Sequence, residues 1–376
     1  MCALRYALIG CAAQIAPSHI AAIARLPDAD LVGMADIAAA GAARAAAAGC
    51  PFFSDHRALL EQTRPDVVVV CAPHPLHAPL TIDCLNAGAH TLVEKPIAVE
   101  VTEADAMIAA ASAAERMLAV SFQHRFDPAI EAMRQFIARG DLGALVRVEC
   151  VEPWFRTDAY YRSASWRSTW QGEGGGVLLN QAIHTLDALC YLIGLPTAVL
   201  GWVNVAGHPV ECEDTAQAML EYADGAHGFT HVSTVEAGAP RHIQIVGDRA
   251  ILDLTGDDLA ITRFSPGLSA YRRESAELFG EPDIASERVV VAPTPPFGEG
   301  HALVHRDFYE AIVSGGAPRC DGVSGRMSLE LANAMVLSSC AQTTVRLPLD
   351  RRAYSALLAE LRAGTRAIPG SVKRDV

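Results

Sequence analysis

The sequence predicts an α/β protein in which an N-terminal doubly wound parallel sheet is followed by an α+β domain with a large, mostly antiparallel sheet. Strands and helices alternate up to about residue 122, which is the pattern of right-handed β-α-β units. Residues 67–70 are consecutive valines, as expected for a strand buried on both faces of a parallel sheet. From residue 198 several strands follow one another without intervening helices, which is typical of antiparallel sheets.

The elements of the first part follow from short apolar runs and from residues that begin or end helices. We expect strands at 5–9, 30–35, 67–71, 90–93 and 118–122, and helices at 15–26, 37–49, 76–87 and 101–116. The helix at 37–49 is rich in alanine, the best helix former. The helix at 76–87 stops before Gly88, a residue type that favours helix ends.

The pattern changes after about residue 125, where we place a domain boundary. We expect helices at 128–139, 174–194 (opened by three glycines), 302–314 and 324–342, and strands at 145–151, 198–205, 215–222, 226–234, 241–246 and 250–254. Residues 265–300, rich in glycine, proline and charge, are expected to form a surface excursion. The predicted domains are 1–123 and 124–348, followed by a C-terminal helix and tail at 349–376.

Composition and charge argue against several classes of protein. Hydrophobic residues make up 51% and charged residues 19% of the chain, which suits large cores and not a disordered chain. The net charge of −13 argues against nucleic-acid and membrane partners. The ten cysteines form no C-x-x-C pair and no zinc-finger spacing. We therefore expect free thiols, no metal site and a cytoplasmic location.

The turn after the first strand is where a dinucleotide would bind, because a glycine-rich loop there brings the backbone to the pyrophosphate at a helix N-terminus. Here only the first glycine of that pattern is present; the loop reads Gly10, Cys11, Ala12, Ala13, Gln14, Ile15. Asp36 ends the next strand, roughly where a carboxylate binds the ribose hydroxyls. The alternative is an ordinary turn and a surface aspartate. No arginine directly follows Asp36, and the nearest is Arg44, so we expect NAD rather than NADP.

Lys95 is informative because only two of the 30 basic residues are lysines, the other being Lys373. It follows strand 90–93 in the turn Glu94-Lys95-Pro96, at a strand end that faces the expected cofactor crevice. The pKa of an ammonium group shifts readily, whereas a guanidinium keeps its proton. The alternative is a solvated lysine. His74 and His77 follow strand 67–71 and either line the same crevice or cap the next helix.

Two further groups of residues could act on a substrate. Asn180, His184 and Asp187 lie at i, i+4 and i+7 of the expected helix, so they would share a face with His184 as a general base. The alternative is a buried, hydrogen-bonded histidine. An aromatic and cationic loop suits sugar faces, cofactor phosphates or a subunit contact; it contains Trp154, Arg156, Tyr160, Tyr161, Arg162, Trp166 and Arg167. Such a loop can also bind single-stranded nucleic acid, although the net charge argues against it.

Taken together, these motifs resemble the Gfo/Idh/MocA family of oxidoreductases, which includes glucose-fructose oxidoreductase and inositol dehydrogenase. The resemblance covers about residues 4–348 and rests on the glycine loop, Ile15-Ala16-x-x-His19, Asp36, Ala72-Pro73-x-x-x-His77, Glu94-Lys95-Pro96, Gly174-Gly175-Gly176 and His184-x-x-Asp187. It implies a Rossmann domain at 1–123, and a domain with an open sheet for substrate binding and oligomerisation at 124–348. It further implies NAD(P)-dependent oxidation or reduction of sugars and cyclitols, a cis peptide before Pro96, and a homodimer or homotetramer.

The resemblance also assigns residues to roles. Lys95 would bind the reacting hydroxyl and His184 would exchange its proton, with Asn180 beside them. We expect the cofactor at Gly10, Ala12, Ala13, Gln14, Ile15, Asp36, Ala72, Pro73, His74, His77, Glu94, Lys95 and Arg125. We expect the substrate at Lys95, Trp154, Arg156, Tyr160, Trp166, Arg167, Asn180 and His184.

Two departures from the family pattern affect these expectations. Ala12 replaces the usual second glycine, so its Cβ holds the backbone farther from a pyrophosphate. Asn180 replaces a frequent aspartate, and an amide cannot take up a proton. Some sugar-nucleotide and glycoside-oxidising members of the family share the form Asn180-Gln181-x-Ile183-His184, so the resemblance implies a sugar or glycoside hydroxyl rather than a free inositol. Two alternatives remain: reduction of a keto-sugar or other carbonyl with His184 as the acid, and a non-catalytic dinucleotide or sugar sensor. Retention of both Lys95 and His184 argues against the sensor.

Overall fold

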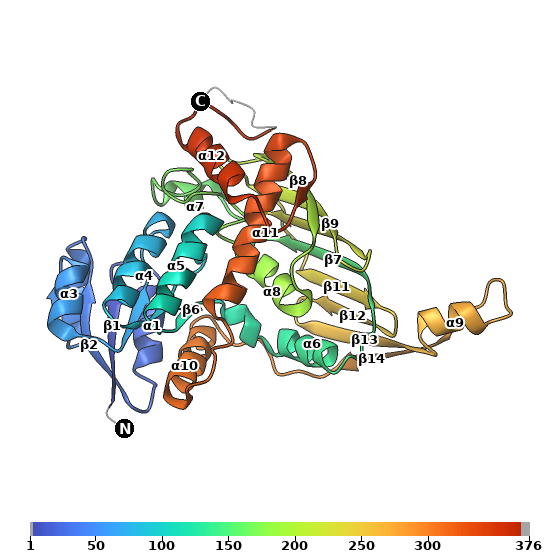
Figure 1. Cartoon of the computed structure of the whole chain (residues 1–376), viewed down its shortest axis with the longest axis horizontal. Helices are drawn as coiled ribbons and strands as arrows, with labels where there is room; N and C mark the ends of the chain where they lie inside the picture. Colours follow the sequence, from blue (N-terminus) through green and yellow to red (C-terminus); the bar gives the residue numbers. More distant parts are fainter. Residues whose placement is uncertain (1–2, 370–376) are drawn as a thin grey trace. The chain divides into compact units, whose positions relative to one another are not determined.

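A computed structural model describes residues 3–369 (Figure 1). The chain divides into two compact units. The first unit contains the described residues up to Phe126 together with 171–174 and 295–330. The second contains 127–170, 175–294 and the described residues from Leu331 onward.

A six-stranded parallel sheet forms the centre of the first unit, in the order β3-β2-β1-β4-β5-β6. Its strands are β1 (Leu4–Ile9), β2 (Ala29–Ala35), β3 (Phe52–Phe53), β4 (Val67–Val70), β5 (His90–Val93) and β6 (Leu118–Val120). This is the doubly wound order, in which the direction of winding reverses between β1 and β4. The predicted parallel sheet is thereby confirmed.

The helices of the first unit lie close to their expected places, with one addition. They are α1 (Ala16–Ile23), α2 (Ala40–Ala47), α3 (His56–Thr63), α4 (His77–Asn86), α5 (Val101–Ala113), α10 (Glu299–Ser314) and the short 3-10 turns η1 (His74–Leu76) and η2 (Gln123–Phe126). We did not predict β3 or α3. The carboxylate of Asp55 caps α3 by accepting the backbone N–H of Arg57 at 2.9 Å.

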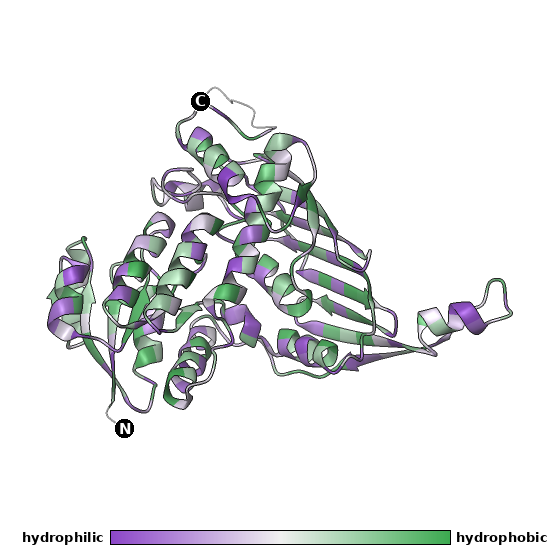
Figure 2. Cartoon of the chain, viewed as in Figure 1, coloured by the Kyte–Doolittle hydropathy of each residue, from purple (hydrophilic) through white to green (hydrophobic). Residues whose placement is uncertain are grey.

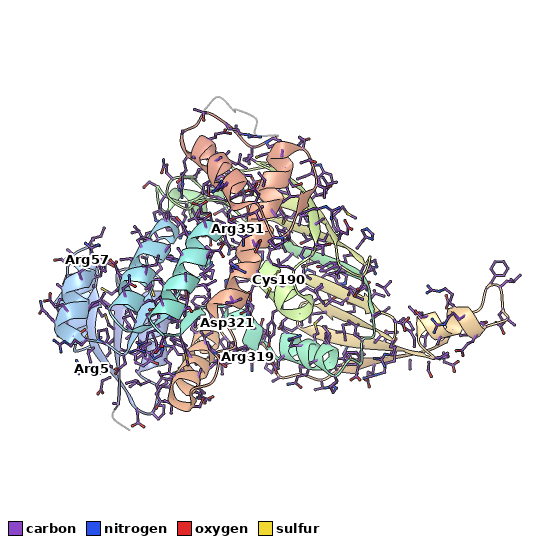
Figure 3. The ribbon with its side chains drawn as sticks, viewed as in Figure 1. Arg5, Arg57, Cys190, Arg319, Asp321 and Arg351 are labelled. Atoms are coloured by element: carbon purple, nitrogen blue, oxygen red, sulfur yellow. The ribbon has the colours of Figure 1, made fainter. Side chains whose placement is uncertain are left out.

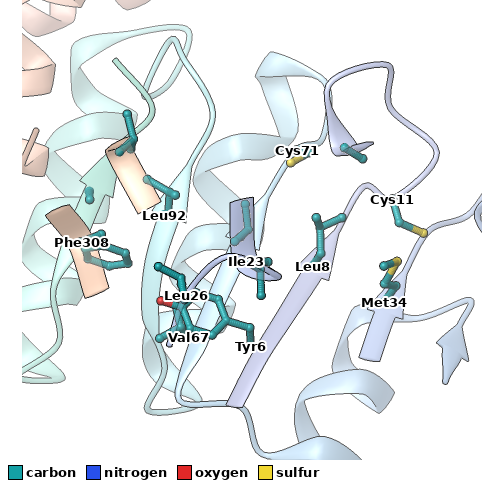
Figure 4. Close-up of a cluster of buried hydrophobic side chains, with 14 of the residues drawn as sticks. Tyr6, Leu8, Cys11, Ile23, Leu26, Met34, Val67, Cys71, Leu92 and Phe308 are labelled. Carbon is teal, nitrogen blue, oxygen red and sulfur yellow. The ribbon is translucent and has the colours of Figure 1, made fainter. Parts of the chain in front are cut away.

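The core of the first unit includes residues from distant parts of the sequence (Figure 4). Tyr6, Val67 and Leu92 come from three strands of the sheet, whereas Phe308 lies on α10. Phe308 is 1% exposed and belongs to the same cluster of buried side chains. This packing explains why residues 295–330 belong to the first unit, although the sequence assigned them to the second domain.

A nine-stranded sheet forms the second unit, in the order β14-β13-β12-β11-β7-β10-β9-β8-β15. Its strands are β7 (Leu145–Pro153), β8 (Ala198–Asn204), β9 (Thr215–Glu221), β10 (His227–Ser233), β11 (His242–Gly247), β12 (Ala250–Thr255), β13 (Asp258–Ser265), β14 (Asp283–Val289) and β15 (Val345–Arg346). The pair β7 and β10 is parallel, and the other pairs are antiparallel. The mostly antiparallel sheet is as predicted, but β13, β14 and β15 were not foreseen.

The helices of the second unit are α6 (Pro128–Ala138), α7 (Asp158–Arg162), α8 (Ile183–Ile193), α9 (Leu268–Glu274), α12 (Arg351–Arg362) and the part of α11 (Gly322–Ala341) from Leu331 onward. The short helices α7 and α9 bury no residue, and α9 projects beyond the ends of β13 and β14 (Figure 1). Apolar residues of α6 and α8 pack against those of β7, β11 and β12. Hydrophobic and hydrophilic residues alternate along the strands (Figure 2). Trp202 and Met219 are 48% and 44% exposed, so part of the sheet surface is not covered.

The C-terminal helix was predicted within residues 349–376 and is α12. Its N-cap Asp350 accepts the backbone N–H groups of Arg352 and Ala353. Residues 370–376 of the predicted tail lie outside the described residues. No helix among the described residues is long and apolar enough to cross a membrane.

Candidate active site

The carboxyl ends of four parallel strands carry the predicted cofactor residues of the first unit. Gly10 follows β1, Asp36 follows β2, Ala72 lies beyond β4 and Glu94 follows β5. In a parallel sheet these ends meet at one edge, and the switch point between β1 and β4 is where ligands of such sheets bind.

Gly10 is required at the turn between β1 and α1. Its φ of +86° lies in the left-handed region, and a Cβ there would stand 2.6 Å from the backbone carbonyl carbon of Cys71. The close approach of these two backbones brings the β1 turn to the end of β4. Ala12, Ala13, Gln14 and Ile15 form the rest of the loop before α1 begins at Ala16. This loop, with the backbone N–H groups of a helix N-terminus beside it, fits a pyrophosphate.

Asp36 lies against the same loop. Its Oδ2 accepts the backbone N–H of Ala12 at 2.7 Å, and its Oδ1 accepts that of Ala38 at 2.8 Å. The carboxylate is therefore fixed at the carboxyl end of β2, and its contact with the ribose of a dinucleotide stays a prediction. Arg44 lies against the loop after β1, although its distance from Asp36 in the sequence did not indicate this. Its guanidinium donates to the carbonyl oxygens of Cys11 and of Ala13, the latter at 2.7 Å.

Lys95 is partly buried in the turn after β5. The peptide bond between Lys95 and Pro96 is cis, as the family resemblance implied. The ring nitrogens of His77 lie 2.7 Å from the carbonyl oxygen of Pro96 and 2.8 Å from that of Ala72. His77 therefore joins the turns after β4 and β5, and both its nitrogens are occupied by backbone groups. Burial lowers the pKa of His77, although the two carbonyl contacts oppose this shift.

His74 is a neutral neighbour of Lys95. Its Nδ1 lies 3.2 Å from the carbonyl oxygen of Glu173. Burial, and then the electrostatic interactions with His77 and Lys95, keep the pKa of His74 well below its usual range. A neutral imidazole can donate or accept a hydrogen bond without adding charge beside a nicotinamide.

Arg125 is fully buried, and its partners include Arg319 in the segment that joins α10 to α11 and Ser324 in the first turn of α11. Its Nη1 donates to the carbonyl oxygen of Arg319 and to the hydroxyl of Ser324, both at 2.8 Å. Arg319 and Asp321, labelled in Figure 3, belong to that segment. These contacts tie η2 to the segment after α10, a structural role that the sequence did not indicate. A cofactor contact by Arg125 stays a prediction.

A cluster of buried histidines lies beside Glu94, and only His19 of this cluster stood in a predicted motif. His19 Nε2 and Glu94 Oε1 are 2.8 Å apart, and His19 Nδ1 and His305 Nε2 are 2.9 Å apart. Burial would lower the pKa of His19, but Cys71 and Glu94 raise it to about 10. Burial would raise the pKa of Glu94, but His19, His301 and Lys95 hold it well below its usual range. The pair is therefore an imidazolium and a carboxylate in the absence of another ligand.

In the second unit, the predicted helix at 174–194 is wrong in its first half, because α8 begins only at Ile183. Glu213 explains the difference. Its Oε1 accepts the backbone N–H groups of Gly176 and Leu178, and its own carbonyl oxygen accepts that of Val177. Because these N–H groups donate hydrogen bonds to Glu213, residues 176–178 do not begin a helix. The same approach explains Gly176, since a Cβ there would overlap the Glu213 carbonyl oxygen.

The late start of α8 also changes the relation of Asn180 to His184. Asn180 lies in the turn before the helix, so the shared helix face expected for Asn180, His184 and Asp187 holds only for the last two. His184 lies in the first turn of α8 and is 8% exposed.

Several residues of the predicted substrate loop meet at Tyr160. Its hydroxyl oxygen lies 2.8 Å from Arg167 Nη1, 3.2 Å from Asn180 Nδ2 and 3.1 Å from Gln181 Nε2, which are all donors. The guanidinium groups of Arg156 and Arg167 lie 5.2 and 4.3 Å from the centre of the ring. Trp154 and Trp166 stack in turn on these arginines. The sequence identified all of these residues except Gln181.

A buried histidine and aspartate support this loop. His208 Nδ1 lies 3.1 Å from Asp214 Oδ2, and His208 Nε2 lies 2.9 Å from the carbonyl oxygen of Arg156. Asp214 also accepts backbone N–H groups of residues 206–208. We did not predict this pair, because neither residue lies in a motif and the contact with Arg156 spans distant parts of the chain.

Comparisons with known proteins agree with this arrangement. Residues 4–122 match the model of the oxidoreductase family with an NAD-binding Rossmann fold, and residues 130–253 match the Gfo/Idh/MocA C-terminal domain. Levoglucosan dehydrogenase of Pseudarthrobacter phenanthrenivorans is 25% identical over 78% of this chain and 83% of its own length. Inositol 2-dehydrogenase 2 of Paenarthrobacter aurescens is 27% identical over 81% of this chain and 86% of its own.

A solved structure of the WlbA dehydrogenase from Bordetella pertussis, in complex with NADH and UDP-GlcNAcA, is similar over 93% of this chain and 100% of its own. The TM-score is 0.78 and the sequence identity 27%. Gly10 and the loop before α1 follow β1, and Asp36 follows β2 and contacts that loop. The chain therefore belongs to the Gfo/Idh/MocA family of oxidoreductases, and its cofactor is NAD.

Proposed function

We propose that this protein is an NAD-dependent dehydrogenase that oxidises a secondary hydroxyl of a sugar, glycoside or cyclitol. The observation that carries the proposal is the place of Lys95 in the first unit. It follows β5 at the edge that carries Gly10 and Asp36, in a chain with only one other lysine. Its ammonium group lies near neutral His74, and an ammonium group can donate a hydrogen bond to a hydroxyl oxygen.

Oxidation of the hydroxyl removes a hydride from the carbon and a proton from the oxygen. When bound, NAD supplies a nicotinamide ring that accepts the hydride from the carbon bearing the hydroxyl. Lys95 binds the hydroxyl oxygen and stabilises the negative charge that develops as the proton leaves. His184 accepts that proton in its neutral form. Loss of this proton and of the hydride converts the substrate alcohol to a carbonyl.

The cluster around Tyr160 supports a sugar-like substrate. Trp154, Trp166 and Tyr160 provide aromatic faces, and Arg156 and Arg167 provide donors beside them. Flat aromatic faces with adjacent donors suit the C–H faces and hydroxyl groups of a pyranose. The comparison with levoglucosan dehydrogenase and with a structure that holds UDP-GlcNAcA supports the same class. Asn180 donates to Tyr160, so we assign it to holding this cluster.

A panel of glycosides, free sugars and cyclitols, with NAD and absorbance of NADH as the readout, tests the proposal. We expect NADH formation with at least one glycoside or sugar, and loss of that signal in Lys95→Ala purified in parallel, which controls for contaminating dehydrogenases. NADH consumption with keto-sugars, without any oxidation, would favour the reductase instead. NAD binding without turnover in either direction would favour a sensor and overturn the proposal.

We further propose that the protein forms a homo-oligomer and is located in the cytoplasm. A homodimer or homotetramer built on the uncovered sheet surface is supported by the exposed side chains of Trp202 and Met219. Light scattering of the full chain, compared with Trp202→Glu, tests this assembly. The nine cysteines within the described range are free, which supports a cytoplasmic location.

A further inference from the structure

Three side chains that are far apart in the sequence meet inside the first unit. His19 lies on α1, Glu94 follows β5 and His301 lies on α10. They are 0%, 7% and 2% exposed. Burying two imidazoles and a carboxylate together costs folding free energy unless each polar atom has a hydrogen-bond or ionic partner.

The donor atoms have nearly the spacing that a metal ion requires. Glu94 Oε1 lies 2.8 Å from His19 Nε2 and 3.9 Å from His301 Nε2, and the three ligand atoms lie within 4.8 Å of one another. Bonds of about 2.0–2.1 Å to a tetrahedral Zn²⁺ place ligand atoms roughly 3.3 Å apart. To bind Zn²⁺, the distance between Glu94 and His19 must increase and that between Glu94 and His301 must decrease, each by about half an ångström. Rotation of the side chains is sufficient for changes of this size.

His301 lacks the partners that a buried imidazole needs. Its Nδ1 is buried with no hydrogen-bond partner among the described residues. Its Nε2 faces Glu94 Oε1 at a distance beyond hydrogen-bond reach. His19 and Glu94 already form an ion pair without His301, so that ion pair does not explain why His301 is buried beside them. A ligand bound by His301 Nε2 would explain it.

The neighbours of the cluster provide the outer contacts typical of metal sites. A histidine that binds a metal through one nitrogen donates its other N–H to an acceptor that fixes the ring. His19 has this geometry, because its Nδ1 lies 2.9 Å from His305 Nε2. Glu94 Oε2, the oxygen turned away from His19, accepts the backbone N–H of Lys95 at 3.2 Å. Both ligands are thus oriented from outside.

We propose that His19, Glu94 and His301 bind a Zn²⁺ ion, with the fourth position open to water. Two imidazoles and one carboxylate are a common zinc ligand set. The ion takes the place of the proton shared by His19 and Glu94. It joins α1, the turn after β5 and α10, and so holds the residue that precedes Lys95. The sequence predicted no metal site, because its ligands lie at positions 19, 94 and 301 and form no motif. This site does not depend on the proposed function.

Metal binding by the full chain tests the site. Chelator-treated protein is titrated with Co²⁺, followed by its visible absorption, and with Zn²⁺, followed by calorimetry and by thermal unfolding. We expect one equivalent of each to bind, Zn²⁺ to displace Co²⁺, and Zn²⁺ to raise the Tm by several degrees. His301→Gln removes one ligand but keeps a polar side chain and should lower the affinity at least about tenfold.

A matched control separates this site from other histidines. His56 also pairs with a carboxylate of the first unit, Asp83, at 2.8 Å. Asp55 lies 3.6 Å from its other ring nitrogen, but among the described residues these side chains do not form a group of three ligand atoms as close together as those of His19, Glu94 and His301. His56→Gln should bind Zn²⁺ as the unaltered chain does. Failure of the unaltered chain to bind a stoichiometric amount of either ion would overturn the proposal, and water would then be the partner of His301. Equal binding by His301→Gln and the unaltered chain would also overturn it. The Tm of each metal-free variant shows whether it is folded.

Discussion

Replacing Asp36 should change the choice between NAD and NADP. The carboxylate is fixed by the backbone N–H groups of Ala12 and Ala38, at 2.7 and 2.8 Å. A 2′-phosphate carries about 1.5 to 2 negative charges. Two unit charges about 4 Å apart repel by roughly 4 kcal/mol at an effective dielectric constant of 20. Because Asp36 is only partly buried, salt and water reduce this value. We expect a preference for NAD of about 1–3 kcal/mol, or roughly 5- to 150-fold.

The assay is calorimetric titration of both cofactors with the unaltered chain and with Asp36→Ala. The variant should lose most of the preference. It also removes an acceptor from the loop, which affects both cofactors alike, so the ratio of the two Kd values is the readout. Asp30→Ala, at the opposite end of β2, is the matched control and should keep the ratio. Equal affinity of the unaltered chain for both cofactors, or an unchanged ratio in Asp36→Ala, would refute the reasoning.

Three further substitutions test other parts of the structure. Lys95→Ala should lower kcat/KM about 10²-fold or more, and Lys95→Arg nearly as much, because a planar guanidinium does not fit a site built for an ammonium; steady-state kinetics in which Lys95→Arg stays active would contradict this. Tyr160→Phe leaves its three donors without their acceptor, so KM should rise more than kcat falls; an unchanged KM would count against the substrate cluster. Gly176→Ala should destabilise the protein by about 3 kcal/mol, since its Cβ overlaps the Glu213 carbonyl; denaturant unfolding checks it, with Gly316→Ala as the control.

The sequence predicted most of the parallel sheet because its strands are short apolar runs. The valines of β4, Gly10 after β1, and the charged residues Asp36 and Lys95 after β2 and β5 locate this edge of the sheet without any long-range information. The two-residue strand β3 is too short to give a clear period. Helix α3 is mostly polar and buries only Leu59, Leu60 and Thr63, so it lacks a marked apolar face. Strand β14 has exposed residues nearly throughout, so it lacks the alternation that identifies a strand.

Tertiary contacts determined the rest. The start of α8 depends on the carboxylate of Glu213, which accepts backbone N–H groups that a helix would otherwise use. The placement of residues 295–330 in the first unit depends on buried side chains such as Phe308. His301 and His208 were missed for the same reason, because their partners are distant in the sequence. In contrast, the loop from Trp154 to Arg167 was identified by composition alone, and its members meet at Tyr160.

The pH dependence of kcat/KM for NAD reduction, in the unaltered chain and in His184→Ala, tests the proposed chemistry most directly. Oxidation needs an imidazole that can take up a proton, so the rate should be low at acid pH and rise as the imidazole loses its proton. His184→Ala should lose about 10²- to 10⁴-fold in rate, together with this rise. A variant that keeps the unaltered rate and the same rise would contradict the assignment of His184 as the proton acceptor, and Lys95 would become the candidate.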